Sequence, residues 1–121
     1  MDLEINDKTS LKDIQEAFNR IYPYLWIDFF YKAVNGSDHT RPEKIKPETA
    51  IKNISALNGN GLINIDGKKS VAELENEFCK TLGLKVKVMR KSGNVWVGTP
   101  YTTNWTLNNQ NSEGEQIIMD L

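Results

Sequence analysis

The sequence contains one histidine and one cysteine, the side chains that most often act as nucleophile, base or metal ligand. His39 lies in a polar stretch, and Cys79 follows Phe78 in an amphipathic segment. A nucleophile needs a paired base, and a zinc site needs several ligands at defined spacing. The sequence offers neither arrangement. We therefore expect no catalytic residue, no metal site and no cofactor, and we expect that the protein is not an enzyme.

A band of basic residues could bind a ligand. Lys85 and Lys87 alternate with apolar residues, and Arg90 and Lys91 follow at the next turn. Alternate residues of a strand share a face, so the band predicts a local positive patch. Basic strands bind RNA when aromatic side chains for base stacking interleave with them. Residues 85–91 contain no aromatic side chain, so nucleic-acid binding is the alternative function rather than the preferred one.

An aromatic stretch, residues 22–31, gives the preferred function. If Leu25, Ile27 and Phe29 face a core, Trp26 and Phe30 face the opposite way. Large apolar side chains on an outer face must be covered. We expect a helix at 48–54 or the C-terminal segment to cover them, with a partner protein or a second copy as the alternative. The sequence thus favours a non-enzymatic protein-interaction module with an unknown partner.

The elements that position these residues are best marked between 62 and 96. A short apolar run at 62–65 predicts a strand, and Ser70 with Glu73 forms a capping box that begins a helix. Gly83 ends the helix, because glycine adopts a left-handed cap without steric cost. The alternation at 84–88 predicts a second strand, and residues 95–97 return from a turn as its antiparallel partner.

The same pattern occurs near the start of the chain. Residues 3–20 align with residues 63–80, so that Ser10 takes the place of Ser70 and Phe18 that of Phe78. The agreement extends through the following strand and predicts an internal repeat, residues 3–31 and 63–89. Two β-α-β units indicate an α+β fold with one mixed or antiparallel sheet and two helices on one face. A ferredoxin-like arrangement is expected, with a β-grasp-like one as the alternative.

The remaining segments carry weaker signals. Residues 33–47 are polar and interrupted by glycine and proline, which predicts a loop, and Pro47 suits the first turn of a short helix at 48–54. Residues 58–61 predict a turn. Residues 98–115 lack periodicity, and 117–121 suggest a last edge strand or a frayed end.

Length and composition are those of an ordinary globular domain. We expect the 121 residues to form one domain, and their net charge of -1 argues against bulk attraction to nucleic acid or to an anionic membrane. No apolar run approaches the roughly 20 residues that span a bilayer. The acidic start predicts no secretory signal, and the lone Cys79 fits a reducing compartment. We therefore expect a cytoplasmic protein.

Short motifs are spread along the chain, each weak alone but specific in combination. They include Tyr22-Pro23-Tyr24-Leu25, Leu82-Gly83-Leu84, Arg90-Lys91-Ser92-Gly93-Asn94 with Trp96, and Trp105-Thr106-Leu107 with Gln110-Asn111. In this combination the chain resembles a family of small uncharacterised proteins from anaerobic gut bacteria. The resemblance implies a self-contained bacterial domain, and it implies no activity, cofactor or catalytic residue.

Overall fold

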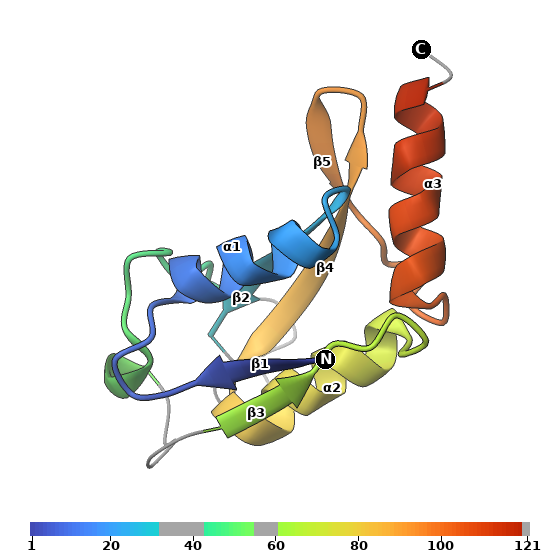
Figure 1. Ribbon diagram of the computed structural model, residues 1–121. Helices are drawn as coiled ribbons and strands as arrows, with labels where there is room; N and C mark the ends of the chain where they lie inside the picture. The colour runs from blue at the N-terminus through green and yellow to red at the C-terminus, as the bar shows by residue number, and fades with distance from the viewer. Residues whose placement is uncertain (32–42, 55–60, 120–121) are drawn as a thin grey trace.

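The computed structural model describes residues 1–31, 43–54 and 61–119. His39, most of the expected loop at 33–47 and most of the turn at 58–61 lie outside these ranges. The described elements, in chain order, are β1 (Asp2–Ile5), α1 (Leu11–Ile21), β2 (Leu25–Phe30), the 3-10 helix η1 (Ile51–Asn53), β3 (Gly61–Asn64), α2 (Val71–Leu82), β4 (Lys85–Ser92), β5 (Val95–Gly98) and α3 (Leu107–Met119) (Figure 1). The α+β class predicted from the sequence is confirmed.

Both α1 and α2 begin at complete capping boxes, as predicted. Ser10 and Ser70 accept from the backbone three residues later, and Asp13 and Glu73 accept from the backbone of the serine. These bonds satisfy N–H groups that a helix start leaves without partners. Gly83 ends α2 with φ of 70°, in the left-handed region that glycine adopts readily.

The expected single sheet is wrong, because the described strands form two sheets. β1 pairs antiparallel with β3, and β2, β4 and β5 form a second antiparallel sheet in the order β2-β4-β5. The physical reason is that each β-α-β unit gives one strand to each sheet, so the apolar faces of both sheets can meet in one core. The ferredoxin-like and β-grasp-like arrangements are not confirmed.

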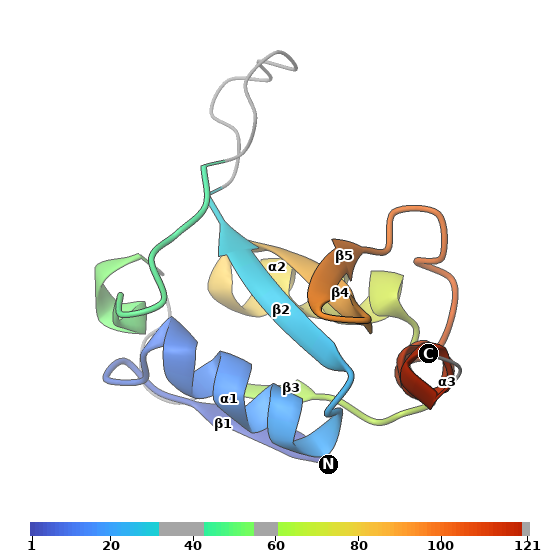
Figure 2. The same ribbon diagram turned by 90° about the horizontal axis from the view of Figure 1, so that it is seen from above.

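The core lies between the two sheets and is completed by α1 and α2. α1 packs against β1 and β2, and α2 packs against β3 and β4. Figure 2 shows α1 beside β2 and α2 passing behind that strand. Alternate residues of β1, β2 and the first half of β4 are buried, and Phe29 of β2 meets Phe78 of α2 edge to face at 5.6 Å. Phe18 and Phe78 are both fully buried.

A return segment contacts the start of each helix in the same way. Backbone N–H groups in the first turn of α1 and α2 have no partner within the helix. In each β-α-β unit, carbonyl groups of a segment that follows the second strand accept hydrogen bonds from them. The corresponding bonds are Leu11 to Thr49 and Val71 to Trp105, both 3.0 Å, and Lys12 to Pro47 and Ala72 to Thr103, both 2.8 Å. A common origin for the two halves of the chain stays a prediction.

The helix expected at 48–54 is shorter than predicted. Residues Pro47 and Glu48 form a turn, and only Ile51–Asn53 are helical. The reason is that backbone groups of this segment bond to the chain at the start of α1. Lys12 donates to the Pro47 carbonyl, and Ile51 donates to the carbonyl of Thr9, just before α1, at 2.8 Å.

The C-terminal segment is a helix, so the predicted edge strand or frayed end is wrong for the described residues. Thr106 begins α3, because its hydroxyl accepts from the backbone N–H of Asn109 at 3.1 Å. The buried positions of α3 are Leu107, Gln110 and Gly114, at helical spacing. A face made of leucine, glutamine and glycine has no apolar periodicity, which explains why no helix was predicted here.

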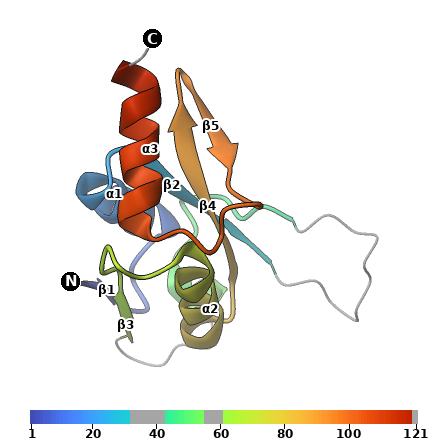
Figure 3. The ribbon, with the colours of Figure 1, turned by 90° about the vertical axis from the view of Figure 1, so that its right-hand side faces the viewer.

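Polar contacts dock α3 beside the β4–β5 hairpin (Figure 3). Gln110 accepts from Arg90 at 3.1 Å and donates to the Thr102 carbonyl at 2.9 Å, and Asn111 accepts from the Tyr24 backbone N–H at 2.9 Å. At Gly114 the helix comes so close to β2 that an added Cβ would lie 2.8 Å from the Cβ of Tyr24.

We predict that Phe78→Ala lowers the free energy of unfolding by about 3–5 kcal/mol, the usual cost of removing a fully buried phenylalanine. Phe18→Ala should cost a similar amount. Urea unfolding followed by far-UV circular dichroism measures both. Val95→Ala, at a side chain that is 58% exposed, is the control. A loss below about 1 kcal/mol for either phenylalanine variant would contradict this packing.

We predict that Gly114→Ala destabilises the protein, although alanine is favoured over glycine inside a helix by about 1 kcal/mol. The new Cβ would meet backbone and Cβ atoms of Tyr24, which cannot move aside as a flexible side chain would. The control is Ser112→Ala at an exposed position of α3. Thermal unfolding should show a lower midpoint for Gly114→Ala only, and an unchanged or higher midpoint would show that α3 is not held this closely.

Candidate ligand-binding face

The outer face of the β2-β4-β5 sheet collects most of the residues that the sequence singled out. Directly paired residues of antiparallel strands share a face, and the register pairs Trp26 with Met89, Phe30 with Lys85, and Lys91 with Trp96. We call this surface the lysine–aromatic face. Its members are Trp26, Asp28, Phe30, Lys85, Lys87, Met89, Lys91 and Trp96.

Aromatic rings and lysine side chains alternate across this face. The rings of Trp26 and Trp96 lie 6.0 Å apart, one on each side of β4. The Lys91 ammonium lies 4.8 Å from the Trp96 ring and the Lys87 ammonium 5.0 Å from the Phe30 ring. Trp26 is thus partly covered by Trp96 of β5, and the cover expected from a helix at 48–54 or from the C-terminal segment stays a prediction.

Arg90 does not belong to the lysine–aromatic face, although the sequence grouped it with Lys85, Lys87 and Lys91. The strand alternation turns it to the opposite side, where its guanidinium donates to Gln110 and lies 5.7 Å from the Trp105 ring. Its role in the structure is to hold α3. The five other predicted patch residues all lie on this face, as the alternation along β2 and β4 requires: Trp26, Phe30, Lys85, Lys87 and Lys91.

The lysine–aromatic face carries a local positive charge. Asp28 is the acidic residue that shares this side of β2, and its carboxylate pairs with Lys44 at 3.4 Å. Asp28 lies directly opposite Lys87 in the register, so the face holds three lysines and one carboxylate. A chain with an overall charge of -1 thus presents an excess of basic side chains on this face.

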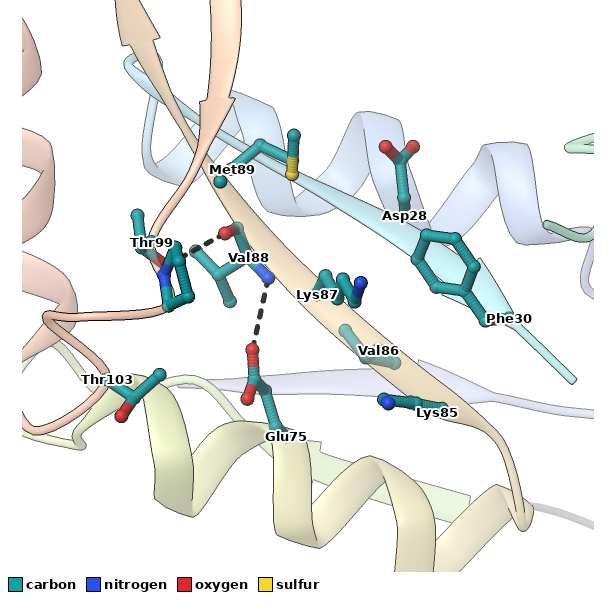
Figure 4. A pocket seen from close by; sticks show the side chains of 12 residues that line it. Asp28, Phe30, Glu75, Lys85, Val86, Lys87, Val88, Met89, Thr99 and Thr103 are labelled. Carbon is teal, nitrogen blue, oxygen red and sulfur yellow. Dashed lines mark hydrogen bonds between the residues drawn. The ribbon is translucent and has the colours of Figure 1, made fainter. Parts of the chain in front are cut away.

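A cavity of about 520 Å³ opens at one end of the lysine–aromatic face, where β5 leaves β4 (Figure 4). Phe30 and Asp28 border it from β2, and Thr99, Pro100 and Thr103 border it from the segment after β5. Its volume lies within the range of about 300–1,000 Å³ that is usual for ligand pockets.

Glu75 of α2 closes the side of the cavity below β4. Its carboxylate accepts from the Val88 backbone N–H at 3.3 Å, while the Thr99 hydroxyl donates to the Val88 carbonyl at 2.9 Å. Burial raises the pKa of the Glu75 carboxyl, and the bond from Val88 and the charges of Lys85 and Lys87 oppose that shift. The cavity therefore combines an aromatic ring, two ammonium groups and carboxylate acceptors.

Residues 1–31, 43–54 and 61–119 contain no group of three or more histidine, cysteine, aspartate or glutamate side chains that could hold a metal ion. Within the same ranges, no helix is long and apolar enough to cross a membrane. Comparison of the chain with protein-family models, with curated proteins and with solved structures finds no match.

Sequence reasoning missed Trp96, Met89 and the cavity. The signal for Trp96 was present: a turn at Ser92-Gly93-Asn94 sets Trp96 opposite Lys91 once the strands pair. That Trp26 and Lys87 lie close together can be known only from the pairing of β2 with β4, which brings together residues about sixty positions apart. The aromatic rings beside the lysines of β4 lie outside residues 85–91, because they come from the two neighbouring strands, β2 and β5.

We predict opposite pH dependences for two glutamates of α2. Because the pKa of Glu75 is raised in the folded state, its contribution to stability is present below the ordinary value of about 4.3 and is lost as the pH rises through the raised pKa. Glu75→Gln keeps an acceptor for Val88 without the buried charge. This variant should be at least as stable as wild type at pH 7, with the difference shrinking towards pH 4.

Glu73→Gln is the matched comparison. The hydrogen bonds of Ser70 lower the pKa of Glu73, so its ionised form stabilises the protein above about pH 4.3 and that contribution is lost on acidification. Glu73→Gln should therefore be the less stable variant at pH 7. Thermal midpoints between pH 3.5 and 7.5 measure both effects, and a Glu75→Gln protein that is less stable than wild type at pH 7 would contradict the burial argument.

Proposed function

We propose that this protein is a non-enzymatic module that binds single-stranded nucleic acid on the lysine–aromatic face. The observation that carries the proposal is the interleaving of Trp26, Phe30 and Trp96 with lysines on one open sheet surface. Single-stranded nucleic acids bind to surfaces that combine stacking rings with cationic groups, because bases stack and phosphates are neutralised.

The charges of the face support nucleic acid over a partner protein. Lysine is depleted in protein interfaces, whereas aromatic residues and methionine are enriched there. Three lysines among the eight residues of the face are therefore unusual for a protein contact and suit a phosphate backbone. The ammonium groups of Lys87 and Lys91, which lie near aromatic rings, can pair with phosphates while a base approaches the same ring.

A partner protein or a second copy of the chain is the second candidate. The observation in its favour is an apolar margin beside the face: Met89 and Pro100 line the cavity, and Tyr101 is 96% exposed. Exposed aromatic side chains mark contact sites in many proteins. The lone Cys79 supports the further proposal that the protein works in a reducing compartment such as the cytoplasm.

We predict that a fluorescently labelled single-stranded RNA of mixed sequence binds the protein and that the binding weakens with salt. The double variant Lys85→Glu/Lys87→Glu should reduce the slope of log K against log salt by about 1.4, since each phosphate contact on a single strand contributes about 0.7. Trp96→Ala should cost about 1–3 kcal/mol of binding, the value of one stacked base. Fluorescence anisotropy at several salt concentrations measures all three proteins.

The matched control is Lys8→Glu/Lys52→Glu, which changes the net charge equally at two exposed positions away from the face. This control should leave the salt slope close to that of wild type. Equal losses in both double variants would indicate only bulk electrostatics and would overturn the proposed face. An absence of RNA and DNA binding, together with a solution mass above that of one chain that falls in Trp96→Ala, would support the second candidate instead.

A further inference from the structure

The cavity at the end of the lysine–aromatic face has features that an open stacking surface does not need. It is walled on the side away from Phe30 by Thr99, Pro100 and Thr103, and it reaches past β4 to the carboxylate of Glu75 (Figure 4). A bound strand lying flat on the sheet would touch none of these walls. The cavity therefore has room for a base that turns out of the bound nucleic-acid strand and away from the sheet surface.

Apart from Lys85, Lys87 and Thr103, the polar side chains that line the cavity are hydrogen-bond acceptors. The Thr99 hydroxyl has its proton committed to the Val88 carbonyl at 2.9 Å, so it offers lone pairs. Glu75 accepts from Val88 through one lone pair of Oε2 at 3.3 Å, which leaves the second lone pair of Oε2 and both lone pairs of Oε1 as acceptor sites. Asp28 adds a second carboxylate on the β2 side. A ligand group that supplies N–H donors to these oxygens, and acceptors to the ammonium groups of Lys85 and Lys87, suits this lining.

We propose that the cavity receives one base of the bound strand and selects bases that carry an amino group, guanine above all, over uracil. This inference rests on the proposed nucleic-acid binding. Phe30 gives the base a ring to stack on, and Lys85 and Lys87 neutralise the flanking phosphates. Guanine presents adjacent N–H donors that match the two oxygens of a carboxylate, and cytosine and adenine each present one amino group. Uracil presents a single N–H donor between two carbonyl oxygens on its pairing edge, so at least one of these oxygens would face carboxylate oxygens.

The test compares an eight-nucleotide uridine strand with three strands in which one central position is guanosine, adenosine or cytidine. Wild-type protein should bind the guanosine strand at least about fivefold more tightly than the all-uridine strand, the lower limit for one good bidentate base contact. Glu75→Gln should lose this preference, because the amide would turn an N–H donor towards the base. Glu73→Gln, on the same helix but outside the cavity, should keep it.

The outcomes separate this inference from the function on which it rests. Binding of all four strands with equal affinity would overturn the base pocket and leave the lysine–aromatic face standing, whereas no binding of any strand would overturn both. A guanosine preference that persists unchanged in Glu75→Gln would show that Glu75 does not select the base. Phe30→Leu, which keeps an apolar side chain but removes the ring, should weaken the guanosine strand more than the all-uridine strand, and an equal loss would contradict stacking in the cavity.

Discussion

The two-residue alternation of β2 and β4 is the constraint on which the rest of the structure depends. Once Leu25, Ile27 and Phe29 are buried, each residue between them must point to the other side of the sheet. Pairing with β4 applies the same rule to Lys85 and Lys87. The core and the lysine–aromatic face are thus the two sides of the same strands. A shift of the strand register by one residue would move the core side chains to the surface and the face side chains into the core.

Local signals predicted what local chemistry determines. The capping boxes at Ser10 and Ser70, the glycine stop at Gly83 and the strand alternation are written within a few residues each, and the structure has them. The pairing of strands is not local, so the two sheets and the meeting of Trp26 with Trp96 could not be derived from neighbouring residues. Helix α3 was missed for another reason, since Gln110 and Gly114 occupy positions where apolar side chains usually mark a buried face.

Gln110 shows how a polar side chain can do the work of a core residue. It is fully buried, and both ends of its amide have partners, with Arg90 on one side and Thr102 on the other. A buried amide is tolerated only when its hydrogen bonds are made, and such bonds are directional in a way that apolar contact is not. The position of α3 along the β4–β5 hairpin is therefore fixed by direction as well as by close approach at Gly114.

The helices also occupy the hydrogen-bonding groups along the outer margins of the β2-β4-β5 sheet. Gln15 donates to the Ile27 carbonyl at 2.8 Å and Asn19 to the Leu25 carbonyl at 2.9 Å, and Glu75 and Thr99 engage both backbone groups of Val88. A strand margin with free N–H and C=O groups is a template for pairing with another chain, which is how edge-to-edge aggregation begins. At these positions the backbone groups already have partners, so a strand of a neighbouring molecule cannot pair with them. The sheet is therefore protected there against edge-to-edge polymerisation at high protein concentration.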